Sequence, residues 1–180
     1  YDVVLDNASD KWGQIAVQGP SAEKTVMDVL GLKGASGLGF YEFMDEQVDG
    51  GRVILSRTGY TGEDGFEVYA SPELIVKFWD ALMAAGVKPC GLGCRDTLRF
   101  EAGLPLYGDE LSEDISPVMA GFSMFCKLDK PEFIGKEALS EQKASGVAKK
   151  IVGLELSDSA VPRAGYPVET PDGETVGGVA

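Results

Sequence analysis

Two strand-like segments separated by a glycine-rich stretch place the strongest constraint on how this chain can fold. Residues 52–57 and 66–70 are rich in β-branched and aromatic side chains, which is typical of β-strands. The intervening residues 58–65 contain three glycines. Because glycine adopts backbone angles that other residues avoid, we expect a loop here that takes unusual dihedral angles or approaches another group closely.

The second of these strands has two chemically different faces. Side chains alternate across a strand, so Phe66, Val68 and Ala70 share one face, whereas Glu67 and Tyr69 share the other. The carboxylate at position 67 is therefore predicted to lie opposite the apolar side chains, just after the glycine-rich loop.

The clearest helix begins at Pro72 and ends at Gly86, which suits a C-terminal cap. Its apolar residues recur as adjacent pairs every four positions and predict a broad stripe that packs in the core: Leu74, Ile75, Phe78, Trp79, Leu82 and Met83. Full burial of such a side chain contributes about 1.5–3 kcal/mol, so we expect a firmly docked, structural helix.

Weaker patterns predict the other elements before residue 149. They are strands at 14–17 and 41–43 and helices after Ser21, at 92–102 and at 133–146. The helix at 92–102 places Arg95 and Arg99 one turn apart on the same face.

The sequence changes character near residue 149. Alternating apolar residues at 151–156 and a hairpin centred on Asp172-Gly173 are typical of an all-β segment. The segment is too short to close a barrel, so we expect further barrel strands beyond Ala180. The start without Met at Tyr1 also predicts a piece cut from a longer chain.

The predicted fold class is α+β, with an antiparallel or mixed sheet, packed helices and the beginning of a C-terminal β-barrel. We divide the chain into the end of a preceding segment (1–12), an α+β region (13–115), a helical connecting segment (116–148) and an incomplete barrel domain (149–180).

Charge and residue content exclude several classes of function. The net charge is −13 and the sixteen Lys and Arg residues are scattered, whereas nucleic acid binding requires a basic surface. No apolar run approaches the roughly 20 residues that span a bilayer. The absence of histidine excludes Ser-His-Asp and Cys-His pairs and histidine-based zinc sites. We therefore expect no nucleic acid, membrane or metal partner.

The three cysteines show no paired spacing. An odd number argues against a disulfide framework and indicates a reducing compartment. Cys90 and Cys94 would share one face if both were helical, but no histidine and too few cysteines are present to complete a metal site. We predict that they are small buried apolar residues.

Six segments in a fixed order carry a resemblance to a known family. They are Ile-Ala-Val-Gln-Gly-Pro (15–20), Thr-Gly-Tyr-Thr-Gly-Glu-Asp-Gly-Phe-Glu (58–67), Gly-Leu-Gly-Cys-Arg-Asp-Thr-Leu-Arg-Phe-Glu-Ala-Gly (91–103), Leu-Tyr-Gly-Asp-Glu-Leu (106–111), Phe-Ile-Gly-Lys-Glu-Ala-Leu (133–139) and Val-Gly-Leu (152–154). Together they resemble the T protein, or aminomethyltransferase, of the glycine cleavage system. The resemblance covers essentially the whole chain, as an internal fragment that lacks the family's N-terminal and C-terminal segments.

The resemblance implies an enzyme that takes an aminomethyl group from a lipoyl carrier protein, the H protein. It implies transfer of the one-carbon unit to tetrahydrofolate with release of ammonia, in the cytoplasm. Family members have three domains around a central opening that holds folate, so the region 13–115 is expected to bind folate.

Three residues match the family's folate pocket: Glu67, Arg95 and Tyr60. A pterin edge presents a ring N–H beside an amino group, and one carboxylate can accept both hydrogen bonds. Glu67 offers that carboxylate. Arg95 can hold an oxygen of folate or form an ion pair with Asp96, Glu67 or Glu101. Tyr60 can pack against folate or cover the core, and Arg99 is expected to be structural.

The family's catalytic Asp belongs to a segment before Tyr1, so we assign no catalytic residue and expect the chain as given to be inactive. Another substrate contact of the family would follow Ala180. Two alternatives remain open. One is the related folate module of dimethylglycine- or sarcosine-oxidising enzymes, or of a protein of tRNA modification and iron–sulfur assembly. The other is a non-catalytic scaffold.

Overall fold

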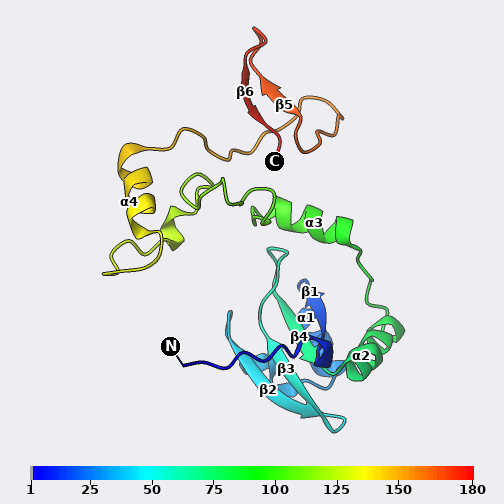
Figure 1. Ribbon diagram of the computed structural model, residues 1–180. Helices are drawn as coiled ribbons and strands as arrows, with labels where there is room; N and C mark the ends of the chain where they lie inside the picture. Colours follow the sequence, from blue (N-terminus) through cyan, green and yellow to red (C-terminus); the bar gives the residue numbers. More distant parts are fainter. Residues whose placement is uncertain (1) are drawn as a thin grey trace. The chain divides into compact units, whose positions relative to one another are not determined.

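The computed structural model describes residues 2–180 and consists of two compact units (Figure 1). The first unit ends at Leu104, and the second runs from Pro105 to Ala180. The division differs from the limits expected near residues 115 and 149, and the four-part domain assignment remains a prediction.

A four-stranded antiparallel sheet forms the centre of the first unit. Its strand order is β1-β4-β3-β2, with β1 at Gly13–Gln18, β2 at Phe43–Val48, β3 at Gly51–Ser56 and β4 at Gly65–Ala70. All three neighbouring pairs are antiparallel. The predicted α+β class with an antiparallel sheet is therefore confirmed.

The expected strand at 41–43 is wrong except for its last residue. Tyr41 has a φ of 66°, which belongs to the left-handed region that β-strands do not use. The amide of Glu42 donates to the carbonyl of Gly39, so a tight turn occupies this position and β2 begins only at Phe43.

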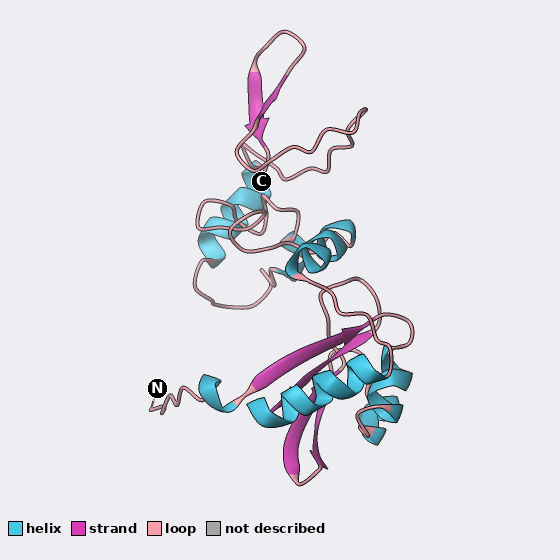
Figure 2. Cartoon of the chain, turned by 90° about the vertical axis from the view of Figure 1, so that its right-hand side faces the viewer, coloured by secondary structure: helices cyan, strands magenta, loops and turns pink. Residues whose placement is uncertain are grey.

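Two helices cover one face of the sheet (Figure 2). They are α1 at Ala22–Asp28 and α2 at Pro72–Ala84. Short 3-10 helices at Ser9–Lys11 and Lys33–Gly37 flank β1 and α1. The core between the helices and the sheet contains Ile15, Val17, Val26, Leu32, Val53, Leu55, Phe66, Val68, Leu74, Phe78 and Leu82.

The apolar stripe of α2 is narrower than its sequence indicates. Leu74, Phe78 and Leu82 are buried, but Trp79 is 44% exposed and Met83 is only partly buried. Successive helical residues are separated by about 100°, so the second member of each adjacent pair lies at the rim of the contact. The prediction that Trp79 is a core residue is wrong.

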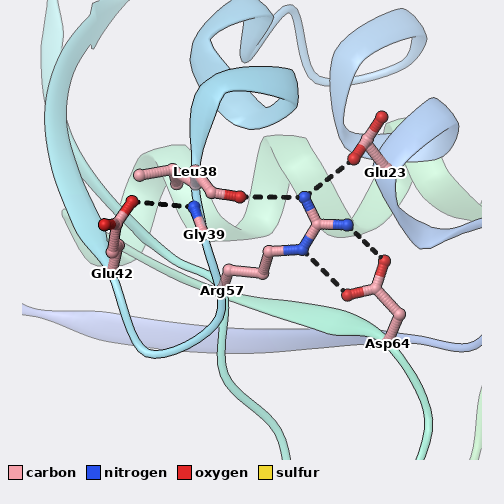
Figure 3. Close-up of polar contacts among 6 residues, drawn as sticks. All are labelled: Glu23, Leu38, Gly39, Glu42, Arg57 and Asp64. Carbon is pink, nitrogen blue, oxygen red and sulfur yellow. Dashed lines mark hydrogen bonds and ion pairs between the residues drawn. The ribbon is translucent and has the colours of Figure 1, made fainter.

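Arg57, just after β3, joins three segments of the first unit (Figure 3). Its guanidinium donates to both carboxylate oxygens of Asp64, at 3.0 and 2.7 Å, and to the carbonyl of Leu38 at 3.0 Å. It also pairs with Glu23 on α1 at 2.8 Å and lies over the ring of Phe66. These hydrogen bonds with Arg57 lower the pKa of Asp64.

A third helix, α3 at Leu92–Glu101, ends the first unit. It agrees with the expected helix at 92–102. Cys90 therefore lies outside the helix and Cys94 in its first turn, and both are exposed. The prediction that they are buried is wrong, because Cys90 lies in the exposed segment before α3 and Cys94 is exposed in the first turn of the helix.

The second unit contains α4 at Lys136–Ser145, a 3-10 helix at Ser123–Phe125 and a hairpin of β5 (Pro167–Glu169) and β6 (Thr175–Gly178). The hairpin around Asp172-Gly173 is confirmed. Residues 151–156 form no strand and are exposed, because no neighbouring strand hydrogen-bonds to them in the described chain.

Candidate functional site

The uncovered face of the sheet carries a group of polar side chains around Glu67. Burial alternates along β4 as predicted, with Phe66, Val68 and Ala70 buried and Glu67 and Tyr69 half-buried on the opposite face. The register places Glu67 between Ala16 of β1 and Ser56 of β3. Small side chains on both sides leave its carboxylate accessible.

Two neighbours fix the orientation of that carboxylate. The side-chain amide of Gln14 donates to Oε1 of Glu67 at 2.7 Å, and the hydroxyl of Thr58 donates to Oε2 at 2.5 Å. The Thr58 hydroxyl also shares a hydrogen bond with that of Ser56 at 2.9 Å. A carboxylate has about four acceptor positions, so these two hydrogen bonds do not saturate Glu67.

Tyr69 adds a third polar group to this face. Its pKa is raised by burial, by the charge of Glu67 and by a hydrogen bond with Glu67. The side-chain amide of Gln14 reaches the Tyr69 oxygen as well, at 3.3 Å. Gln14, Glu67 and Tyr69 therefore form one connected network on the sheet.

The glycine-rich loop at 57–64 is held by Gln18. The side-chain amide of Gln18 donates to the carbonyls of Thr58 and Phe66, at 3.1 and 3.2 Å, and its oxygen accepts from the hydroxyl of Thr61. A Cβ added at Gly65 would lie 2.4 Å from this amide group. The predicted close approach at a glycine is thus observed, and Gln18 is the group that approaches.

The same loop reaches α3. The guanidinium carbon of Arg95 lies 4.9 Å from the centre of the Tyr60 ring, a cation–π contact. At Gly62, where φ is +76°, an added Cβ would lie 2.7 Å from the Cβ of Ala102. Thr58 and Tyr60, two residues apart, therefore contact Glu67 and Arg95 respectively.

The two arginines of α3 have different environments. Arg99 is buried and donates to Asp96 at 2.7 Å and to the carbonyl of Leu104 at 3.4 Å, in agreement with its expected structural role. Arg95 is exposed, and within residues 2–180 no ion pair joins it to Asp96, Glu67 or Glu101. The contact of Arg95 with Tyr60 was not anticipated.

Of the three sequence-predicted site residues, the structure brings Tyr60 and Arg95 into contact and places Glu67 in a separate network. Sequence reasoning missed Gln14, Thr58 and Gln18. Alternation along β1 places Gln14 and Gln18 opposite the buried Ile15, but their partners depend on the pairing of β1 with β4, which lies far away in sequence.

No cluster of three Cys, Asp or Glu side chains able to hold a metal ion is found within residues 2–180. No helix in that range is both long enough and apolar enough to cross a membrane.

Comparison with known proteins identifies the family to which this chain belongs. Residues 1–130 match the model of the GCVT N-terminal domain, and the chain belongs to that family.

Two individual relatives are both aminomethyltransferases. The chain is 51% identical to an aminomethyltransferase from Lysinibacillus sphaericus, with 99% of the chain and 50% of the relative covered. It is 48% identical to an aminomethyltransferase from Thermoanaerobacter pseudethanolicus, with 98% and 49% covered. The chain thus spans about half the length of the curated relatives it matches.

A solved structure agrees with this assignment. The crystal structure of glycine cleavage system aminomethyltransferase T from Bartonella henselae superposes with a TM-score of 0.81 at 31% sequence identity. The match covers 93% of this chain and 46% of the solved one. The fold described above is therefore part of the aminomethyltransferase fold.

Proposed function

We propose that this chain contributes the folate-binding part of an aminomethyltransferase of the glycine cleavage system. The whole enzyme would transfer a one-carbon unit from the aminomethyl-lipoyl arm of the H protein to tetrahydrofolate and release ammonia, in the cytoplasm. The names of the relatives favour this reaction over the related folate modules of sarcosine- or dimethylglycine-oxidising enzymes.

The observation that carries the proposal is the geometry of Glu67. Its two carboxylate oxygens are oriented by Gln14 and Thr58, and the remaining acceptor positions are shared between the Tyr69 hydroxyl and a ligand that displaces it. The edge of a pterin presents two parallel donors, which such a carboxylate accepts together. Because two neighbours already hold the carboxylate in place, little side-chain entropy is lost when it binds.

Arg95 and Tyr60 extend the proposed site. The guanidinium is exposed and planar, and it can donate to the carbonyl oxygen of the pterin or to a carboxylate of folate. The ring of Tyr60 holds the guanidinium from one side through the cation–π contact. Folate bound by Glu67 and Arg95 would lie beside Thr58 and Tyr60 of the glycine-rich loop.

We also propose that the chain alone is catalytically inactive, because no carboxylate of residues 2–180 matches the family's catalytic Asp. The start of a barrel at 149–180 is proposed on the same resemblance. A turnover assay with lipoylated H protein and tetrahydrofolate tests the first statement. Product formation above background would overturn it.

Thermal unfolding tests the folate site itself. Tetrahydrofolate at millimolar concentration should raise the melting temperature of the chain by mass action. Glu67→Ala and Arg95→Lys should each reduce that rise, measured for each variant against its own melting temperature without ligand, because Glu67→Ala also removes the acceptor of Gln14 and Thr58. Glu63→Ala, which removes an exposed carboxylate from the same loop, is the matched control and should retain the full rise. If tetrahydrofolate did not raise the melting temperature of the unmodified chain, the alternative of a non-catalytic scaffold would be favoured.

A further inference from the structure

Tyr69 lies beside Glu67 on the uncovered face of the sheet, and one side chain of β1 joins the two. The side-chain nitrogen of Gln14 donates to Oε1 of Glu67 at 2.7 Å and to the hydroxyl oxygen of Tyr69 at 3.3 Å. The register of β1 and β4 also pairs Gln14 directly with Tyr69. Both oxygens therefore lie within hydrogen-bonding distance of one nitrogen atom. The phenol group is thus next to the carboxylate that the proposed function assigns to folate.

The Tyr69 hydroxyl accepts from Gln14, because the amide nitrogen can only donate. Its own hydrogen remains to donate to another group. Tyr69 is half-buried, and its raised pKa keeps the hydroxyl protonated in neutral solution. Tyr69 therefore supplies a hydrogen-bond donor beside the acceptors of Glu67.

Ligand binding changes which acceptor the Tyr69 hydrogen can use. A carboxylate has about four acceptor positions. Gln14 and Thr58 occupy two positions on Glu67, and the two donors of a pterin edge would occupy the others. The Tyr69 hydrogen then needs an acceptor on the ligand, because a partly buried donor without a partner costs free energy.

A pterin edge offers such an acceptor at each end of its two donors. The carbonyl oxygen lies beside the ring N–H, and the ring nitrogen N1 lies beside the amino group. Thr58 binds Oε2 of Glu67 and belongs to the loop whose Tyr60 contacts Arg95. Tyr69, in contrast, shares its Gln14 donor with Oε1. If the carbonyl oxygen is directed to Arg95, N1 is therefore directed to Tyr69.

We propose that Tyr69 is a further folate-binding residue, whose hydroxyl donates to N1 of the pterin while Gln14 holds it in position. The inference rests on the proposed function, because it requires Glu67 to bind the two-donor edge. Glu67 and Tyr69 would together select a ring with two donors followed by an acceptor, which is the pattern of a 2-amino-4-oxo ring. A ring with a donor in place of N1 would direct its hydrogen against that of the hydroxyl.

Titration calorimetry with two ligands tests the proposal on the whole chain. The ligands are tetrahydrofolate and its 1-deaza analogue, in which a C–H group replaces N1. Tyr69→Phe keeps the ring and removes the hydroxyl, so it should weaken tetrahydrofolate binding by about 3- to 10-fold. The same variant should change the affinity for the 1-deaza analogue by less than about twofold, because that ligand has no acceptor for the hydroxyl.

Two further variants complete the experiment. Tyr166→Phe removes an exposed tyrosine hydroxyl from the second unit and is the matched control. It should bind both ligands as the unmodified chain does. Gln14→Leu removes the amide that holds both oxygens, so it should reduce the preference for tetrahydrofolate over the 1-deaza analogue.

Two results would overturn the proposal. One is equal affinity of the unmodified chain and Tyr69→Phe for tetrahydrofolate. The other is an equal loss of affinity for both ligands in Tyr69→Phe, which indicates a purely structural role. If either result were found while Glu67→Gln still weakened binding, only the role of Tyr69 would fail. If the unmodified chain did not bind tetrahydrofolate, the proposed function would fail with it.

Discussion

Glu67 and Tyr69 lie two residues apart on one face of β4, and the charge of Glu67 helps to raise the pKa of Tyr69. The alternation of polar and apolar residues was enough to predict that they share this face. Their partners Gln14 and Thr58 were not predictable, because these contacts depend on the pairing of β1 with β4 and on the path of the loop. Face assignments follow from local sequence, whereas hydrogen-bond partners follow from tertiary structure.

The first prediction concerns the ionisation of Tyr69. Its pKa is raised by burial first, and then by the charge of Glu67 and their hydrogen bond. Glu67→Gln should therefore lower the pKa of Tyr69 but leave it above the ordinary value of 10.0. NMR titration of ring-labelled tyrosine measures this change, and Glu63→Gln is the control that should cause none.

The raised pKa of Tyr69 also determines how the stability of the chain changes with pH. Because the pKa of Tyr69 is higher in the folded chain than in the unfolded chain, its stabilising contribution is fully present below the unfolded pKa. This contribution is lost as pH rises through the folded pKa. The free energy of unfolding of the unmodified chain should therefore fall more steeply in alkaline solution than that of Glu67→Gln. If the free energy of unfolding fell equally steeply with pH in both proteins, this coupling between Glu67 and Tyr69 would be contradicted.

The second prediction compares two arginines that each make a bidentate pair with an aspartate seven residues away. The Arg57 side chain is 20% exposed and that of Arg52 is 56% exposed. Arg57→Ala should lower the free energy of unfolding by about 2–3 kcal/mol, because it leaves partly buried acceptors without donors. Arg52→Ala should have little effect, because solvent replaces its pair with Asp45.

Urea denaturation of the two variants measures this difference. Equal losses of stability for Arg57→Ala and Arg52→Ala would show that the network around Arg57 contributes no more than a surface ion pair.

At the scale of elements, the helices and strands of the first unit follow closely from the sequence, and the errors have physical causes. Periodicity located α2 but overestimated its buried stripe, since Trp79 lies at the rim. The alternation at 151–156 indicated a strand, but a strand forms only when a neighbour completes its hydrogen bonds. The left-handed backbone of Tyr41 is not a conformation that its residue type predicts.

The third prediction concerns the loop between β3 and β4. Gly65→Ala should displace the Gln18 side chain and lower the free energy of unfolding by about 1–3 kcal/mol. The double variant Gly65→Ala, Gln18→Ala should lose less than the sum of the two single variants, because the alanine at position 65 then has space. Gly37→Ala, where an added Cβ meets nothing within 4 Å, is the control. Strict additivity in denaturation experiments would refute the role given to Gln18.

At the scale of the whole molecule, the two units differ in how much they bury. The apolar core belongs almost entirely to the first unit, and within 105–180 only Ala120 is a buried hydrophobic residue. The sequence predicted the elements of the second unit, α4 and the hairpin, better than their packing. Apolar residues such as Ile134 and Leu154 satisfy the pattern of a buried element and yet are exposed.

The fourth prediction follows from this contrast. Backbone amides of α4 and of the β5–β6 hairpin should exchange with solvent much faster than those of β1, β3 and β4, because few buried contacts resist local opening. Hydrogen exchange followed by mass spectrometry measures the difference. Equal protection of the two units would mean that the second is stabilised by contacts of another kind.

The central claim is that the carboxylate of Glu67 binds the two-donor edge of a pterin. Titration calorimetry with tetrahydrofolate, on the unmodified chain, Glu67→Gln and Glu63→Gln, tests it directly. Loss of a charge-assisted bidentate contact should weaken binding by about 10- to 100-fold in Glu67→Gln, with Glu63→Gln unchanged. Equal affinity of all three proteins would contradict the claim.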